Sequence, residues 1–419
     1  MPPPSLTLPG PSGDPPFRSR KEGGSCPVVS LVMDHYFPEI HAGVVKAARE
    51  LGWDLDDARC RGYHGSMFPK NWNPDGVLAT TATDPCLDWV RQCGVPVVRL
   101  LEDAAPSSFG QTPDDIPSVV LGRSAAGRIA AQHLLSLGTP HLVYHKYYQD
   151  REDESLFRAF VETCRAQGRE PMVLDFPAEH PDFAPSYVMP RPRRLHWLQE
   201  KIASLPRPCA LMADDDRFAI EVVLCAAALG LRVPEDVAVL GCEDLSLVHG
   251  RSEVPLSSID MNLSLLGRTA ARILDGLLQG GPPPPRRTVV PPKRLVERQS
   301  TATFVCPEPA VSRTVLRIRR DFAEPLTVVS LAREAGLSVR SLQRLYRETT
   351  GTTISQALKE KRLEAAASLL RETTFKLDPI AMETGLGNAK NLWRLFKEHF
   401  GVTPGQWREA PHDLPLSTH

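Results

Sequence analysis

From residue 27 onward, short apolar runs alternate with longer amphipathic stretches. The first run, Pro27–Asp34, has the length and the β-branched residues of a buried strand, and Glu39–Leu51 has apolar residues at the spacing of one helix face. Strands of this kind that alternate with helices are typical of a parallel sheet covered on both faces. The same pattern predicts further strands at Asp75–Thr80, Val95–Leu101, Ile116–Leu121, His141–Tyr144, Met172–Phe176, Cys209–Ala213 and Val237–Gly241.

The helices expected between these strands indicate more than one sheet. They are Ala125–Leu137, Ser155–Arg165, Leu195–Leu205 and Phe218–Leu229. About nine strand and helix units in roughly 270 residues are more than one small sheet accommodates. We therefore expect an α/β domain of two lobes, each a doubly wound parallel sheet.

A proline-rich segment, Gly280–Thr301, ends this alternation. Its prolines exclude a helix and disfavour a central strand, so it predicts a crossing strand followed by a domain boundary. We expect a disordered leader at 1–26, a ligand-binding domain at 27–300, a linker at 301–311, an all-α domain at 312–410 and a tail at 411–419. Within the ligand-binding domain, the first lobe is predicted from about 27–139 and 256–283, and the second from about 140–255 and 284–300.

The all-α part contains an internal repeat of Leu331–Gly351 in Ile380–Gly401. Ala332, Gly336 and Leu337 correspond to Ala381, Gly385 and Leu386 at an offset of 49 residues. After one extra residue the offset is 50, and Leu342, Arg344, Leu345, Tyr346, Glu348 and Gly351 match Leu392, Arg394, Leu395, Phe396, Glu398 and Gly401. Each copy is a helix, a turn that contains glycine, and a second helix, which is the pattern of a helix-turn-helix unit.

The second helix of each copy has a polar face opposite its apolar stripe. Outward Arg, Gln and Asn side chains near the start of such a helix can pair with base edges in the major groove of DNA. The candidate DNA-binding residues are Arg340, Ser341, Gln343 and Arg344 in the first copy and Asn388, Lys390, Asn391, Trp393 and Arg394 in the second. The amphipathic stretch Ile354–Leu370 would join both units rigidly, so that they face successive major grooves.

Charge is distributed unevenly along the chain. Residues 311–409 hold 17 Lys and Arg against 11 Asp and Glu, although the whole chain has a net charge of -1. A basic segment on an acidic body indicates a polyanionic partner at one end. A helical bundle with solvated basic faces is the alternative, but it does not explain two matched copies with turn glycines at the same place.

Residues 312–408 resemble the AraC-type DNA-binding domain, including the closing GVTPGQWR at Gly401–Arg408. The preceding body resembles periplasmic sugar-binding proteins and lactose-repressor-type regulators, most clearly at Gly230–Val248. Pro255–Asn262 is similar to the family's crossover to the first lobe, and Val290–Thr301 to its exit strand. The resemblance implies a cytoplasmic transcription regulator of sugar catabolism genes, a homodimer on a double-stranded operator, with a small sugar or sugar derivative as effector. Ligand-driven closure of the lobes would then reorient the DNA-binding domains.

The effector is expected at the carboxyl ends of the strands, where open α/β sheets bind ligands. The polar candidates that follow predicted strands are Asp34, Tyr36, Arg123, Asp216, Glu243 and Asp244. The carboxylates would bind sugar hydroxyls, and Tyr36 or Trp89 would lie beneath the ring. The run of aspartates at 214–216 has an equally good explanation as a helix N-cap.

Three positions differ from the family's pattern. Gly122-Arg123 replaces an Asp that follows a strand, Glu243-Asp244 replaces an Asp-Asn pair, and the segment 215–218 (DDRF) replaces Asn-Asp-x-Arg. Two polar ligand contacts are therefore replaced, which argues against xylose as the effector. Replacement of buried hydrogen-bonding groups changes specificity by orders of magnitude.

Other classes of function lack their motifs. The nine cysteines include no C-x-x-C pair and the 12 histidines no H-E-x-x-H, so we expect neither a metal nor a cofactor. The carboxylate pairs would suit a glycosidase, and an AraC-type domain also suits a cysteine-based DNA-repair protein. No nucleophile elbow or phosphate loop is present, and we expect no catalytic residue. A transporter's solute-binding protein would carry a signal peptide, and no apolar run approaches the ~18 residues of a membrane span. The sequence does not separate activator from repressor.

Overall fold

The structure is a computed structural model that describes residues 26–33, 36–57, 73–80, 94–100, 116–147, 156–181, 189–248 and 250–409. Nearly all of the expected leader at 1–26 and the whole tail at 411–419 lie outside these residues. The chain divides into two compact units, one made of Met1–Val120 and Leu263–Val290 and the other of Leu121–Asn262 and Pro291–His419. Each unit contains one sheet, which confirms the predicted fold class of two doubly wound lobes followed by a helical domain.

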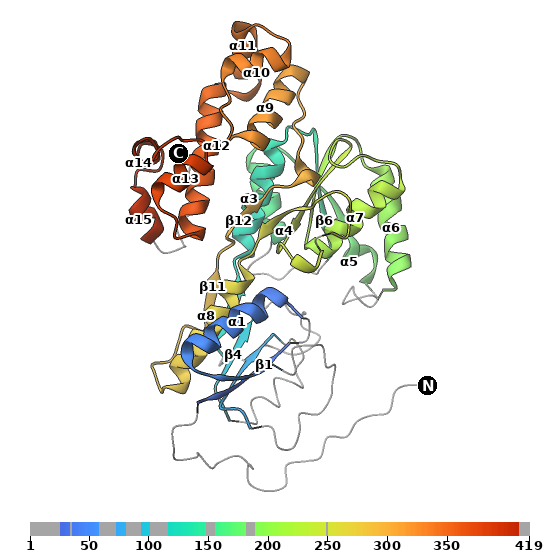
Figure 1. The fold of residues 1–419 in the computed structure, drawn as a ribbon. Helices are drawn as coiled ribbons and strands as arrows, with labels where there is room; N and C mark the ends of the chain where they lie inside the picture. The colour runs from blue at the N-terminus through green and yellow to red at the C-terminus, as the bar shows by residue number, and fades with distance from the viewer. Residues whose placement is uncertain are drawn as a thin grey trace. The chain divides into compact units, whose positions relative to one another are not determined.

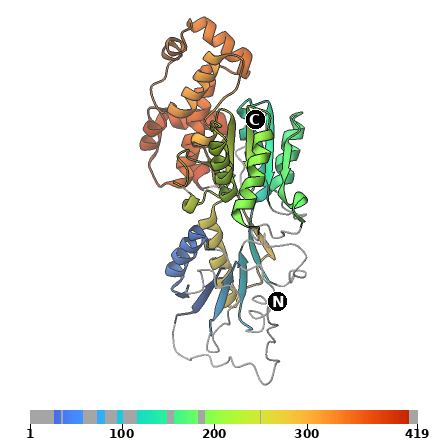
Figure 2. The ribbon, with the colours of Figure 1, turned by 90° about the vertical axis from the view of Figure 1, so that its right-hand side faces the viewer.

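The first unit is built on a six-stranded sheet of order β11-β5-β4-β3-β1-β2. Its strands are β1 (Val28–Val32), β2 (Asp54–Asp56), β3 (Gly76–Ala79), β4 (Val97–Leu100), β5 (Ser118–Leu121) and β11 (Arg287–Val290). The pairs formed by β1 to β5 are parallel, and these strands run side by side as blue and cyan arrows in Figure 2. Helices α1 (Pro38–Leu51) and α8 (Leu263–Leu278) pack against each other in this unit (Figure 1).

The second unit contains the other six-stranded sheet, of order β12-β10-β9-β8-β6-β7. Its strands are β6 (His141–Lys146), β7 (Met172–Asp175), β8 (Cys209–Ala213), β9 (Val237–Cys242), β10 (Ser257–Asp260) and β12 (Arg294–Val296). All described pairs are parallel except β10 with β12 at the edge. The helices of this lobe are α3 (Arg123–Ser136), α4 (Leu156–Ala166), α5 (Phe176–Glu179), α6 (Arg191–Ser204) and α7 (Asp216–Ala228).

The chain crosses between the lobes at other points than the sequence predicted. The expected boundaries at 139/140, 255/256 and 283/284 are replaced by boundaries at 120/121, 262/263 and 290/291. Helix α3 belongs to the second lobe because it packs closely on α4, where a Cβ at Gly127 would lie 2.4 Å from the Leu156 carbonyl oxygen. Strand β10 belongs there too, because it pairs with β9 and β12.

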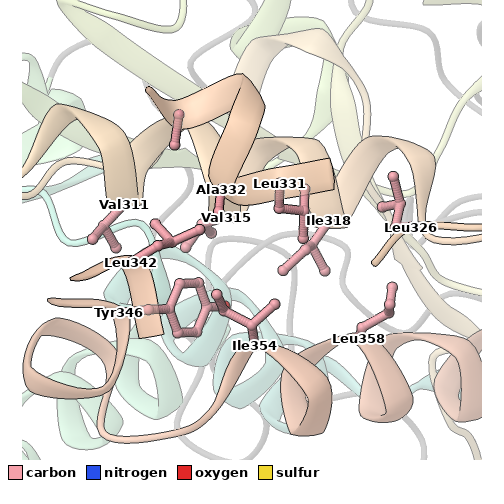
Figure 3. Close-up of a cluster of buried hydrophobic side chains, with 11 residues drawn as sticks. Val311, Val315, Ile318, Leu326, Leu331, Ala332, Leu342, Tyr346, Ile354 and Leu358 are labelled. Atoms are coloured by element: carbon pink, nitrogen blue, oxygen red, sulfur yellow. The ribbon is translucent and has the colours of Figure 1, made fainter. Parts of the chain in front are cut away.

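The helical domain is part of the second unit and surrounds two hydrophobic cores. Its helices are α9 (Pro309–Asp321), α10 (Val328–Ala335), α11 (Val339–Thr350), α12 (Ile354–Glu372), α13 (Leu377–Glu383), α14 (Ala389–Phe400) and α15 (Pro404–Glu409). Figure 3 shows the first core, where Val315, Leu342, Tyr346 and Ile354 meet. The second core is formed by residues that include Leu363, Ile380, Leu392, Phe396 and Trp407. Helix α12 contributes to both cores, as the sequence predicted for a rigid connection.

The expected linker at 301–311 is not a free tether. Thr301 and Thr303 are buried, and the Val305 amide donates to the Leu137 carbonyl at 2.7 Å. Helix α9 begins at Pro309, inside the predicted linker. The helical domain is therefore attached to the second lobe by packed chain.

The turn glycines of the two helix-turn-helix units provide a matched pair of substitutions. Gly336 and Gly385 both have positive φ, 72° and 70°. A Cβ at Gly336 meets no atom within 4 Å, whereas one at Gly385 would lie 2.7 Å from the Ala323 carbonyl oxygen. Gly336→Ala should lower the free energy of unfolding by about 1–2 kcal/mol through backbone strain alone. Gly385→Ala should lower the free energy of unfolding by the same strain and by about a further 1–3 kcal/mol, because the new Cβ overpacks against the Ala323 carbonyl. Urea unfolding followed by circular dichroism measures both, and equal losses would contradict the tighter second turn.

Candidate DNA interface and effector site

The second helices of the two repeats, α11 and α14, are built alike. Each has 12 residues and an N-cap side chain that accepts from the backbone, Ser338 Oγ from Ser341 N at 3.1 Å and Asn388 Oδ1 from Asn391 N at 2.9 Å. Each ends at a glycine of positive φ, Gly351 and Gly401. Two independent stretches of sequence therefore produce the same capped helix, with its apolar stripe turned inward.

The opposite faces of these helices are exposed and hold matching ion pairs. Arg344 Nη1 lies 2.7 Å from Glu348 Oε2, and Arg394 Nη1 lies 3.3 Å from Glu398 Oε2. Surface pairs of this kind contribute about 0–1 kcal/mol, so each arginine can leave its glutamate for a stronger acceptor. Arg340, Gln343 and Lys390 are exposed on the same helices.

Trp393, one of the candidate DNA-binding residues, lies on the exposed face of α14. Its side chain is 43% exposed, and Lys397 Nζ lies 5.2 Å from the ring centroid. Exposure of a large apolar ring to water costs free energy. An exposed tryptophan beside basic residues therefore supports a partner surface at this helix.

Three of the predicted DNA-binding residues have roles inside the fold. Asn388 is the N-cap of α14, and the equivalent Ser338 caps α11 through the amide of Ser341. Asn391 donates from Nδ2 to the Leu386 carbonyl at 2.9 Å and accepts from Arg394 Nη2 at 3.1 Å. The preference of Ser and Asn for N-cap positions was the sequence signal for the capping roles of Ser338 and Asn388. Arg340, Gln343, Arg344, Lys390, Trp393 and Arg394 are the candidates whose side chains are exposed and cap neither helix, and base reading by each candidate stays a prediction.

A polar edge lies where β8 and β9 end and α3 and α7 begin. Arg123, the first residue of α3, reaches Glu243, with 3.4 Å between Nη2 and Oε1. Glu243 is buried directly after β9 and has φ of 100°, and Asp244 has φ of 53°. Positive φ in a residue other than glycine is strained by about 1–3 kcal/mol and recurs at functional sites. The strain is held by β10, because Glu243 N donates to the Ile259 carbonyl at 2.8 Å and Asp244 N to Ser258 Oγ at 3.0 Å.

Asp216 lies behind this edge. Asp216 is 1% exposed, and its carboxyl group accepts from Ser258 Oγ at 2.5 Å and from Leu245 N at 2.7 Å. Burial raises the pKa of Asp216 well above its usual range, although these two hydrogen bonds lower it. The structure thus gives Asp216 a role in holding the turn after β9, and its effector contact stays a prediction.

The neighbouring aspartates are also used by the fold. Asp215 caps α7 by accepting from Arg217 N at 2.8 Å and Phe218 N at 3.1 Å. Asp214 accepts from Tyr144 Oη at 2.6 Å. The capping interpretation of the run at 214–216 therefore describes Asp215.

Arg298 is a member of the polar edge that sequence patterns did not identify. Its Nη1 donates to Asp244 Oδ1 at 2.7 Å and to the Leu256 carbonyl at 2.8 Å. It follows β12 on the exit strand, a position that lies 54 residues from Asp244 in sequence. No local pattern indicates a pair formed over such a separation.

The remaining predicted effector residues belong to the first unit or lie outside the described residues. Tyr36 is in the first unit, where its hydroxyl lies 3.2 Å from His41 Nδ1, and His41 Nε2 lies 2.9 Å from Asp57 Oδ2. Asp34 and Trp89 lie outside the described residues. The structure therefore brings together Arg123, Glu243 and Asp244.

The described residues offer neither a metal centre nor a membrane span. They contain no group of three or more His, Cys, Asp or Glu side chains arranged to hold a metal ion. No helix within the described ranges is both long and apolar enough to cross a membrane.

Comparison with known proteins agrees with this architecture. The sequence pattern of the periplasmic binding protein-like domain matches residues 131–301, and that of a helix-turn-helix domain matches residues 331–410. The chain is 25% identical over 353 residues to the xylose operon regulatory protein of Escherichia coli K12, which covers 83% of this chain and 87% of that protein. The protein of that name from Haemophilus influenzae is 22% identical over 342 residues, covering 80% and 84%.

Solved structures show the same fold. The xylose-binding transcription activator xylR matches with a TM-score of 0.54 and 21% identity, covering 92% of this chain and 98% of that one. The transcriptional regulator CelR in complex with cellobiose matches with a TM-score of 0.51 and 24% identity, covering 65% and 84%. The match to the first of these structures covers both the α/β lobes and the helical domain.

Proposed function

We propose that this chain is a sequence-specific, DNA-binding transcription regulator that responds to a small carbohydrate-like effector and controls sugar catabolism genes. The observation that carries the proposal is the pair of matched recognition helices, α11 and α14, fixed to one connecting helix in a unit that also holds the polar edge of an α/β lobe. The order of the domains and the names of the relatives support the sugar class. The proposed partner is double-stranded DNA, and the proposed location is the cytoplasm. The proposed function involves no catalysed reaction.

The effector contacts in the second lobe are Arg123, Glu243 and Asp244. A guanidinium group and two carboxylates supply the donors and acceptors that a sugar's adjacent hydroxyls require. Arg123 also departs from the family's acidic residue, so the sugar differs from xylose in the groups that meet this position. Sugar acids and sugar phosphates therefore belong in any search beside neutral pentoses and hexoses.

A thermal-shift screen of the full chain against such a panel tests the sensor. A sugar at 100 times its Kd stabilises the native state by about 2.7 kcal/mol, which raises the midpoint by a few degrees. Glu243→Gln should remove the stabilisation, since it removes a carboxylate oxygen from the site and the partner of Arg123. Glu170→Gln, on an exposed glutamate paired with Arg165, is the control and should retain it. A silent panel, or unchanged stabilisation in Glu243→Gln, would contradict the assignment.

We also propose that the protein acts as a homodimer. Operators with two-fold symmetry present two half-sites, which paired DNA-binding domains occupy together. Analytical ultracentrifugation at micromolar concentration should show a dimer. A monomer both with and without DNA would overturn this part of the proposal.

A further inference from the structure

Two adjacent residues of the exit strand make ion pairs in different parts of the second unit. Arg298 pairs with Asp244 at the polar edge, with 2.7 Å between Nη1 and Oδ1. Glu297 pairs with Lys361 of α12, with 2.8 Å between Oε1 and Nζ. Lys361 lies midway along the helix that connects the two helix-turn-helix units. One strand end therefore contacts both the candidate effector site and the DNA-binding domain.

The Glu297–Lys361 pair lies within a larger contact between the helical domain and the second lobe. Arg319 of α9 donates from Nη2 to the Ser136 carbonyl at 3.1 Å and from Nη1 to the Thr303 carbonyl at 3.3 Å. Val305 N donates to the Leu137 carbonyl at 2.7 Å. The end of α3 thus serves as the docking surface for the start of the helical domain.

A buried chain of hydroxyl groups joins this contact to the strands of the lobe. His133 Nε2 lies 2.9 Å from Thr301 Oγ1, and Thr301 Oγ1 donates to Ser257 Oγ at 2.8 Å. Ser300 Oγ accepts from Ser257 N at 2.8 Å and donates to the Val239 carbonyl at 2.6 Å. The exit segment is therefore fixed to β9 and β10, the strands that hold Glu243 and Asp244.

Electrostatics keep the Glu297–Lys361 pair charged. Burial opposes ionisation of Glu297, but Lys361, His133 and Arg319 outweigh it and lower its pKa to about 2. Burial lowers the pKa of Lys361, but the effect of Glu297 and Glu364 is larger and raises this pKa above its usual range. His133 is neutral near pH 7, because burial lowers its pKa to about 4. The contact is thus a charged cluster of Glu297, Lys361, Glu364 and Arg319 beside a neutral imidazole.

We propose that Arg298 and Glu297 transmit the state of the effector site to the DNA-binding domain. The proposal rests on the proposed function, in which Asp244 binds a sugar hydroxyl. That hydroxyl competes with Arg298 for the Asp244 carboxylate. When the ion pair between Arg298 and Asp244 changes, the adjacent ion pair between Glu297 and Lys361 changes with it. Because α12 joins both units, a shift in its docking moves both recognition helices together. Arg298 and Glu297 are positioning residues and do not read DNA.

Amide hydrogen exchange of the full chain tests this route without any sugar. Lys361→Met should speed exchange in α12 several-fold by removing the pair. Asp244→Asn and Arg298→Met should do the same from the other end of the route, because they remove the ion pair at the polar edge. The matched control is Asp236→Asn, because Asp236 pairs with Arg232 in the same lobe and is not part of the route. The variant Lys361→Arg, which keeps a cation opposite Glu297, should retain the slow exchange.

Two outcomes would overturn the proposal. Wild-type exchange in α12 of Asp244→Asn and Arg298→Met, with faster exchange in Lys361→Met, would make the Glu297–Lys361 pair a local attachment only. Wild-type exchange in all three would show that the pair does not hold the domain. Neither outcome bears on the sugar screen, so a failure of the route and a failure of the proposed function are distinguishable.

Discussion

Alanine at Arg344 or at Arg394 is expected to weaken specific DNA binding by about 1–3 kcal/mol each, or about 5- to 150-fold in Kd. Both side chains stand on the outer faces of α11 and α14, each paired with a surface glutamate. In the major groove a guanidinium group forms two hydrogen bonds with guanine, and alanine forms none. The measurement is fluorescence anisotropy at fixed salt, with a duplex selected by the wild-type chain from a random library.

Arg165→Ala is the matched control for this experiment. Arg165 also forms an exposed pair with a glutamate, at 2.7 Å from Glu170, but it lies on α4 of the second lobe. It should leave the affinity unchanged. Wild-type affinity in both Arg344→Ala and Arg394→Ala would mean that the recognition helices are misassigned.

Asp216→Ala should destabilise the second unit by about 2–4 kcal/mol, because it leaves two buried donors, Ser258 Oγ and Leu245 N, without their acceptor. Asp216→Asn is the informative comparison. The single amide oxygen of asparagine can replace only one of the two carboxyl oxygens that accept from Ser258 Oγ and Leu245 N, so we expect a smaller loss than in the alanine variant, about 1–2 kcal/mol. Chemical unfolding of the three proteins measures the difference. An alanine variant as stable as the wild type would contradict the role of Asp216 in the turn.

The same residue gives a pH dependence of known sign. The pKa of Asp216 is raised in the folded state, so the folded chain binds more protons than the unfolded chain above pH 3.8. The contribution of Asp216 to stability is therefore complete below that pH and decreases as the pH rises towards the folded-state pKa, by about 1.4 kcal/mol for each pH unit. Asp216→Asn should lack this decrease, which unfolding midpoints measured between about pH 4 and pH 8 would reveal. An unchanged pH profile in the asparagine variant would contradict it.

The sequence predicted the strands of the cores well, because local apolar patterns specify them. The five residues Cys209–Ala213 are buried throughout, and the predicted and observed strand coincide. Assignment of the elements to lobes depended on packing between distant segments. Helix α3 was expected in the first lobe, but Gly127 allows close contact with α4, and this contact is invisible in the local pattern.

The candidate site residues show the same difference between features set by local sequence and features set by contacts between distant segments. The outward faces of α11 and α14 follow from helical periodicity and from the repeat, so the exposed positions of Arg344 and Arg394 were predicted. The role of Asp216 depends on Ser258, which is 42 residues away, and Asp244 meets Arg298 only through the antiparallel edge strand. Carboxylates after strands were correctly expected at one edge, but the sequence could not tell which of them the fold itself would use.

The central claim is that a sugar controls DNA binding by this chain. The most direct test compares the Kd of the full chain for the selected duplex with and without the sugar that raises its unfolding midpoint, at one salt concentration. We predict a change of about 5- to 150-fold, as coupling of about 1–3 kcal/mol between two sites produces. An identical Kd at saturating sugar would contradict the account, since the protein would then bind sugar and DNA independently.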